Sequence, residues 1–207
     1  MDSSFLISAF ATLFVVIDPI GITPIFIALT QGSDARHRRA VALRAVMIAF
    51  MVLTLFAFFG EAVLGFIGIS MPAFRISGGI LLFLIAIEML FEKRTKRRED
   101  KAGAQEEDHP DPSVFPLSVP LIAGPGSIAT MILLSGQTSG LTEFGLVLSV
   151  MAGVLIMVLA LFMLGGVIER ALGKIGVTVI SRLLGMLLAA LSVQFVLDGL
   201  RDFGILA

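Results

Sequence analysis

The chain has no cysteine, no tryptophan and no tyrosine, and only two of its 207 residues are histidine. The absence of cysteine excludes disulfide bonds, thiolate metal sites and a cysteine nucleophile. Because His37 and His109 both lie in polar segments, a zinc site would have almost no ligands. The sequence therefore indicates a protein without a metal or another cofactor.

Charge is scarce as well. Charged residues make up 15% of the chain and hydrophobic residues 57%, and the mean hydropathy is +1.01. A soluble domain typically contains about 25% charged residues. The formal net charge is −1 and the basic residues fall in short clusters, which excludes a nucleic-acid-binding surface. This composition is typical of a protein embedded in a lipid bilayer.

Six apolar stretches are each long enough to cross a membrane. The hydrocarbon core of a bilayer, about 30 Å thick, requires about 20 residues at a helical rise of about 1.5 Å per residue. The stretches cover residues 5–29, 40–60, 72–91, 114–136, 144–168 and 177–200. Residues 1–4 contain no basic side chain, so we expect the first stretch to be an uncleaved span and not a signal peptide. The sequence predicts an all-α, multi-pass membrane protein with six transmembrane helices.

Basic residues lie beside alternate loops between these stretches. Thirteen of the fifteen Lys and Arg residues flank the loops after the first, third and fifth stretches, which leaves only Arg75 and Arg201 for the other side. Because cytoplasmic loops retain basic residues, both termini are predicted to lie outside the cytoplasm. The charged, proline-containing segment 92–112 is then a cytoplasmic linker, and its composition predicts mobility.

Two parts of the sequence repeat each other at a nearly constant spacing. The pattern E-x-x-L-G-x-I-G, followed by R-x-x-G, occurs twice, at residues 61–68 with 75–78 and at residues 169–176 with 182–185. Upstream, residues 18–21 (Asp-Pro-Ile-Gly) correspond to residues 124–127 (Gly-Pro-Gly-Ser). Gly and Leu recur in any apolar helix, which explains a single match but not three matches that share an offset of 106 to 108 residues.

This repeat predicts how the chain is organised. Each copy holds three stretches, an odd number, so the second copy must enter the membrane from the opposite face. We therefore expect two inverted three-helix repeats, residues 1–91 and 113–207, joined by the linker 92–112. In transporters built this way the substrate site lies near the membrane midplane, where the two repeats meet.

The first and fourth stretches each contain helix-breaking residues near their middle. Proline inside a helix removes a hydrogen bond and clashes with the preceding turn, an effect of about 3 kcal/mol. Asp18-Pro19, with Pro24 further on, occupies a position that corresponds to Gly124-Pro125-Gly126. Both helices are therefore predicted to be broken, and backbone that leaves a helix at membrane depth must line an internal site.

The two breaks are the predicted substrate or ion site. Asp18 suits an N-cap with Pro19 at the first helical position, and two half-helix N-termini facing each other would favour an anion. The residues expected there are Asp18, Pro19, Gly21, Thr23, Pro24, Gly124, Pro125, Gly126, Ser127 and Thr130. An ionisable group at this depth usually faces a pathway, pairs with a partner or exchanges protons. The open alternatives are that Asp18 only caps its own helix and that the Gly-Pro-Gly segment is a packing kink.

Three other charged residues are candidates for gating or coupling. Arg75 and Arg182 form a repeat-related pair at opposite membrane faces, and each would alternatively anchor a helix end. Glu88 lies near the cytoplasmic end of the third stretch, where it would alternatively extend its carboxylate to the interface.

The motifs at the two breaks resemble those of a known family. The chain reads D-P-x-G-x-x-P-x-F at residues 18–26, R-x-x-G-G at 75–79 and G-P-G-x-x-x-T at 124–130. Together with the six-span length, these motifs are similar to those of the MarC family of bacterial inner-membrane proteins. The resemblance covers essentially the whole chain. It implies a multi-pass protein of the cytoplasmic membrane, grouped with the lysine exporter superfamily of small inverted-repeat transporters, and it implies no particular substrate.

These observations predict a secondary transporter or exporter of a small metabolite, such as an amino acid or a similar anion. With no Walker motif in the chain, a proton or sodium gradient would supply the energy. A channel and a non-transporting scaffold or regulatory protein remain as alternatives. An intramembrane enzyme is disfavoured because the chain has neither a G-x-S-x-G nor an H-E-x-x-H motif. The expected partners are the lipid bilayer and the small solute. The sequence is equally compatible with a monomer and with a homodimer that buries a glycine-rich face.

Overall fold

The computed structural model describes residues 3–94, 96–98 and 111–205 of the chain. Every regular element within these residues is helical. In chain order they are α1 (Ser3–Ile17), α2 (Pro19–Leu29), α3 (Ala35–Phe66), α4 (Met71–Leu90), η1 (Ser113–Ile122), α6 (Pro125–Ser135), α7 (Leu141–Met163) and α8 (Gly165–Asp202). The prediction of an all-helical protein is confirmed for the described residues.

The helices match the thickness of a bilayer. Five candidate spans are long and apolar enough to cross one: Ser3–Leu29, Ala35–Phe66, Met71–Leu90, Leu141–Met163 and Ile175–Asp202. The sixth candidate combines η1 and α6, which meet at a bend of 57°. The described chain thus has five candidate membrane-crossing helices, or six with this bent pair, as the hydropathy pattern predicts.

One predicted boundary is wrong. The sequence places the fifth span at residues 144–168, but α7 ends at Met163 and α8 begins at Gly165. Hydropathy misses this turn because the apolar run continues through it. The first part of α8 is separated from the rest by Gly173, whose φ of 58° requires a residue without a Cβ atom.

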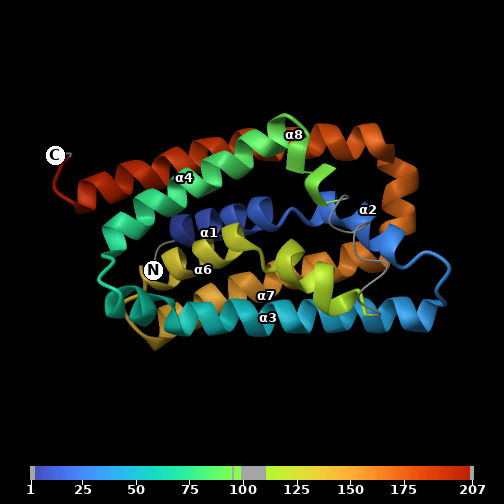
Figure 1. Cartoon of the computed structure of the whole chain (residues 1–207), viewed down its shortest axis with the longest axis horizontal. Coiled ribbons are helices and arrows are strands. Elements are labelled where there is room, and N and C mark those ends of the chain that lie inside the picture. Colours follow the sequence, from blue (N-terminus) through green and yellow to red (C-terminus); the bar gives the residue numbers. More distant parts are fainter. Residues whose placement is uncertain (1–2, 95, 99–110, 206–207) are drawn as a thin grey trace.

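The helices form three layers, each made of two neighbouring elements (Figure 1). The helices α4 and α8 lie side by side along one edge, α1 and α6 lie in the middle, and α3 and α7 form the opposite edge. The start of α1 and the end of α8 lie at the same end of the bundle (Figure 1). This arrangement accommodates an even number of membrane crossings.

The layers enclose two hydrophobic cores. The larger core contains residues of α1, α2, α3, η1, α6 and α7. The smaller core joins the end of α1, at Val15 and Val16, to α4 and α8. The α4–α8 pair is therefore packed as a unit of its own against the middle layer.

The helix α3 shows how the sequence places one face inside and one face toward lipid. Asp34 begins it as the N-cap, its carboxylate accepting a hydrogen bond from the backbone N–H of His37 at 2.6 Å. Small residues spaced three or four apart, such as Ala42, Ala45 and Ala49, are fully buried. Large apolar side chains on the other face are exposed, as expected for a surface solvated by lipid tails.

Candidate functional site

The junction between α1 and α2 leaves backbone carbonyls without helical partners. Asp18 adopts a left-handed conformation (φ 57°, ψ 64°), and its carboxylate accepts from the backbone N–H of Gly21 at 3.1 Å. Asp18 is therefore the N-cap of α2, with Pro19 at the first helical position, as predicted. The carbonyls of Val16 and Ile17 need other donors, because unpaired polar groups at membrane depth are unfavourable.

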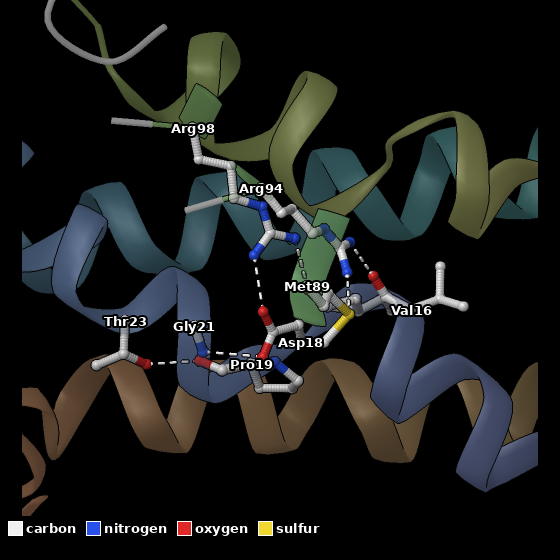
Figure 2. A network of polar contacts seen from close by, with 9 residues as sticks. Val16, Asp18, Pro19, Gly21, Thr23, Met89, Arg94 and Arg98 are labelled. Atoms are coloured by element: carbon white, nitrogen blue, oxygen red, sulfur yellow. Dashed lines mark hydrogen bonds and ion pairs between the residues drawn. The ribbon is translucent and has the colours of Figure 1, made fainter. Parts of the chain in front are cut away.

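Two arginines from the segment after α4 supply these donors (Figure 2). Arg94 donates to the carbonyl of Val16, and Arg98 donates to the carbonyl of Ile17 at 3.2 Å. Both residues are buried, with exposed fractions of 8% and 6%. A guanidinium group carries five N–H donors, so one side chain is able to satisfy several oxygens at a helix end.

This packing corrects an expectation about the linker 92–112. Its charge and proline content predict a solvated segment, but residues 93–94 and 96–98 are helical, and Arg94 and Arg98 fold into the bundle. The expectation is wrong for this part next to α4. The remainder of the linker, residues 99–110, lies outside the described residues. Composition alone missed the contact because the oxygens that attract the arginines lie about 80 positions earlier in the chain.

Arg98 also forms an ion pair with Asp18. The guanidinium Nη1 lies 3.0 Å from the carboxylate Oδ2, and the two side chains are only 7% and 4% exposed. Each charge is buried away from water, so each depends on the other for compensation. Of the three roles that an intramembrane carboxylate usually has, Asp18 takes that of pairing with a partner, and the partner is Arg98.

Arg94 has no such counter-charge among its direct partners in the described chain. Its guanidinium donates to the Val16 carbonyl and lies 3.0 Å from the Sδ atom of Met89, and both groups are uncharged. Burial is the main factor that lowers the pKa of Arg94 to about 9, the nearby Arg98 charge adds to this, and Asp18 opposes it. The group is still protonated at neutral pH.

A cavity of about 170 Å³ lies beside these arginines. We call it the arginine cavity. It is lined by Arg94, Arg97 and Arg98, by the loop Gly124–Ser127 and by apolar residues of α1, α4 and η1. At about 30 Å³ per water molecule in the liquid, the cavity has room for about five or six waters or a solute of similar size.

The N-terminus of α6 opens into the same cavity. Gly124 is the N-cap, Pro125 is the first helical residue, and no side chain caps this end of the helix. The Ser127 hydroxyl accepts from the backbone N–H of Gly124 at 2.9 Å and lies 2.7 Å from the Ile122 carbonyl, so it is occupied in holding the loop. The backbone N–H groups of Gly126 and Ser127 at the start of α6 therefore contribute a positive potential to the cavity wall.

The structure brings together only some of the predicted site residues. Gly124, Pro125, Gly126 and Ser127 line the arginine cavity, and Asp18 is joined to it through Arg98. The other predicted residues do not line it: Pro19, Gly21, Thr23, Pro24 and Thr130. Within the described residues, no group of three or more acidic or histidine side chains is placed to hold a metal ion.

The hydroxyls of the two predicted threonines are occupied by their own helices. Thr23 donates to the Pro19 carbonyl at 2.7 Å, and Thr130 donates to the Gly126 carbonyl at 2.8 Å. Both bonds run four residues back along the chain, a common habit of threonine in apolar helices. These hydroxyls are bonded within their own helices and do not line the cavity.

The three candidate gating residues all form ion pairs. Arg75 pairs with Asp202 and Arg182 pairs with Glu92, which ties α4 to α8 at both ends. Glu88 pairs with Arg97 at 2.7 Å. Only Glu88 is connected to the arginine cavity, because Arg97 is part of its wall.

Arg94 and Arg98 are the site residues that sequence reasoning missed. A signal was present, since an intramembrane Asp18 calls for a cationic partner. However, six Lys and Arg residues lie between residues 93 and 101, and nothing in their order distinguishes the two that fold inward. The spacing of four, which puts Arg94 and Arg98 on one helical face, becomes informative only once this segment is known to be helical.

Comparison with known proteins places the chain among membrane proteins from both bacteria and archaea. Residues 3–203 match the family described as "MarC family integral membrane protein". The UPF0056 membrane protein MJ1677 of Methanocaldococcus jannaschii is 37% identical over 97% of this chain and 98% of its own length. The UPF0056 membrane protein YvbG of Bacillus subtilis is 36% identical over 97% of this chain and 96% of its own length. The UPF0056 inner membrane protein YhgN of Escherichia coli is 35% identical over 95% of this chain and 96% of its own length.

No solved structure matches this chain. The sequence relatives cover nearly the whole of it, so the assignment concerns the complete bundle and not a single motif. With the apolar helices and the lipid-facing surface described above, they agree on one identity. The chain belongs to the MarC family of integral membrane proteins.

Proposed function

We propose that this protein is a secondary transporter that moves a small metabolite, such as an amino acid or a similar anion, across the cytoplasmic membrane by alternating access. The observation that carries the proposal is a pair of cavities with polar residues in their walls. They lie at opposite ends of the contact between the α4–α8 pair and the middle layer, which we call the seam. A transporter needs a site reachable in turn from each side, and an internal cavity with polar walls is otherwise rare at membrane depth.

The second cavity lies at the other end of α1 and α6. It measures about 70 Å³, and its polar walls come from Ser8, Gln137, Gln194 and Asp198. We call it the far cavity. Ser8 in the far cavity and Val16 in the arginine cavity are both on α1, eight residues and thus about 12 Å apart along the helix axis. Between the cavities the seam is filled by apolar side chains of the smaller core, so no open path connects them in this conformation.

The packing supports the inverted repeat of residues 1–91 and 113–207. Two pairs of elements that would correspond are neighbours in the same layer, α4 with α8 and α3 with α7. In the middle layer the neighbour of α6 is α1, whereas the repeat pairs α6 with α2. The ion pair Arg75–Asp202 connects the two copies directly, and Arg182 of the second copy pairs with Glu92, the first residue of the linker. On this proposal, Ser3–Leu29 and η1–α6 are two discontinuous spans in corresponding positions.

The α4–α8 pair is the element that we expect to move. A Cβ atom on Gly79 would lie 2.8 Å from the backbone oxygen of Ser192, and one on Gly185 would lie 2.9 Å from Met89 Cβ, so the two helices are in close contact. Because this pair contains one helix from each copy, it would rock against the middle layer as a unit.

A proton or sodium gradient would drive the cycle. Asp18 is buried and paired with Arg98, so we propose that it sets the charge and position of the arginine and does not contact the solute itself. Breaking this pair during the cycle would release Arg98, which lines the arginine cavity, from the α1–α2 junction. A ligand or ion that favours the released state would thereby shift the equilibrium between the two conformations.

The proposed orientation places both termini outside the cytoplasm, and it is testable because the chain has no native cysteine. Single cysteines at Ser33, before α3, and at Ser139, before α7, would report on opposite sides of the membrane. We expect a membrane-impermeant maleimide added to intact cells to label Ser139→Cys and not Ser33→Cys. The reverse pattern in intact cells, with both sites labelled after lysis, would invert the proposed topology.

Alternating access is tested by locking the seam. A Cβ atom on Gly78 would lie 2.9 Å from Cδ1 of Leu133 on α6, whereas one on Gly79 would lie 2.8 Å from Cγ2 of Val196 on α8. In proteoliposomes that take up labelled amino acids or small carboxylates, a short thiol crosslink in Gly78→Cys/Leu133→Cys should reduce uptake about tenfold or more. A reductant should restore uptake, because it removes the crosslink that prevents the rigid-body movement of the helices.

The matched control is Gly79→Cys/Val196→Cys, which crosslinks α4 to α8 within the proposed moving unit. Crosslinking should leave its uptake nearly unchanged relative to the reduced form of the same variant, which carries the same substitutions. Equal inhibition by both crosslinks would contradict the proposed moving parts. Uptake that does not saturate with solute concentration would indicate a channel, and the absence of uptake of any solute would indicate a scaffold or regulatory protein.

A further inference from the structure

We propose that the arginine cavity binds a small anion with a single negative charge, held between the guanidinium of Arg94 and the N-terminus of α6. The inference rests on the proposed function, since it names the class of solute that the transporter carries. It assigns a binding role to Arg94, which the sequence motifs do not contain.

The first argument is the charge around the cavity. Three guanidinium groups, Arg94, Arg97 and Arg98, line it, and two carboxylates pair with them: Asp18 with Arg98 and Glu88 with Arg97. Among the described residues one positive charge is left over, and it belongs to Arg94, whose direct partners there are neutral. A buried charge without compensation is strongly unfavourable, and a bound anion would provide the compensation.

The second argument is the arrangement of donors in the wall that the start of α6 forms. The start of α6 is not capped by any side chain, and Gly126 keeps this wall clear of a Cβ atom that would lie 2.6 Å from Ile85 Cδ1. N–H groups at a helix start and a guanidinium group that line the same small cavity are donors of the kind that carboxylates and phosphates use in proteins. Both groups of donors therefore attract the same sign of charge.

The third argument concerns which anions fit. The volume of about 170 Å³ is sufficient for a small carboxylate or a single phosphate. An amino acid is a zwitterion, and no unpaired carboxylate among the described wall residues is placed to receive its ammonium group. The charge balance therefore favours simple monoanions over amino acids, and it excludes cations.

The binding test uses the purified full-length protein in detergent and four defined solutes. Thermal unfolding is followed against acetate, dihydrogen phosphate at mildly acid pH, glycine and methylammonium at constant ionic strength. We expect a saturable rise in the midpoint temperature with acetate or phosphate, and little or none with glycine and methylammonium. Equal responses to acetate and glycine, or no saturable response to either anion, would overturn the proposal.

Variants locate the binding. Arg94→Gln should weaken anion binding about tenfold or more, because a charged hydrogen bond is lost, and Arg94→Lys should retain part of it. The control is Arg36→Gln, which removes an exposed charge in the first turn of α3 and should bind as the unaltered protein does. If Arg94→Gln is folded and binds the anion normally, Arg94 is not the binding residue and the proposal fails. If that variant does not fold, the comparison of acetate with glycine in the unaltered protein still decides.

Flux measurements separate this inference from the proposed function. Saturable anion binding without any anion exchange in proteoliposomes would leave the site intact and refute transport. Saturable exchange of neutral or zwitterionic solutes, with no anion binding to the purified protein, would support transport and refute the anion site.

Discussion

Asp18→Asn is expected to lower the free energy of unfolding by about 3 to 5 kcal/mol, because it leaves the buried Arg98 guanidinium without its counter-charge. The two side chains are only 4% and 7% exposed, so water cannot replace the lost carboxylate. The change also removes part of the N-cap of α2, since the carboxylate accepts from Gly21. Thermal or denaturant unfolding in detergent, followed by circular dichroism, measures the effect.

Two controls distinguish the loss of the ion pair from other consequences of the substitution. Glu92→Gln breaks the Arg182–Glu92 pair, whose side chains are 52% and 40% exposed, and should change stability by less than about 1 kcal/mol. The double variant Asp18→Asn/Arg98→Gln removes both buried charges and should recover part of the lost stability. A single Asp18→Asn variant as stable as the Glu92→Gln variant would show that the Asp18–Arg98 pair is not a buried, mutually dependent pair.

Gly79→Ala is expected to lower the free energy of unfolding by about 1 to 3 kcal/mol. The added Cβ atom would lie 2.8 Å from the Ser192 backbone oxygen and 3.1 Å from the Val196 backbone nitrogen, so the backbones of α4 and α8 must separate. Because a flexible side chain cannot absorb this contact, the whole helix pair has to adjust. The same unfolding measurement applies, and uptake assays would show whether the adjusted pair still moves.

Gly153→Ala is the matched substitution on α7. A Cβ atom there meets no other atom within 4 Å, so the gain in helix propensity, about 0.5 to 1 kcal/mol, is not opposed. The two variants differ by the same methyl group and should change stability in opposite directions. If both stabilise the protein, the close approach of α4 and α8 does not depend on Gly79.

The sequence was most informative where local physics dominates. Hydropathy located the candidate spans, because apolar length is a property of each segment alone. Asp18 and Pro19 predicted the start of α2, since a cap and an N1 proline act within one turn. The turn at Leu164 and the kink at Gly173 were missed, because neither interrupts the apolar pattern.

The site itself was only partly predictable. The Gly-Pro-Gly segment lines the arginine cavity, as expected of a glycine loop at a helix start. The cavity's charge was not predictable, because it depends on Arg94 and Arg98 folding across to α1 from a segment that reads as a solvated linker. The burial of a charged side chain is decided by distant oxygens, which no local pattern contains.

The separation of Asp18 from its partner has a consequence for membrane insertion. The ribosome adds about 80 residues after Asp18 before Arg98 emerges. Until then, the first span carries a carboxylate that disfavours insertion by about 2.5 to 3.5 kcal/mol at the centre of a helix. A nascent chain that ends with α3 therefore holds its first span less securely than a chain that includes the segment after α4. The amino-terminal helix is fixed in the bilayer by residues synthesised three helices later. Stable insertion of the first half of the protein therefore requires the segment that follows α4.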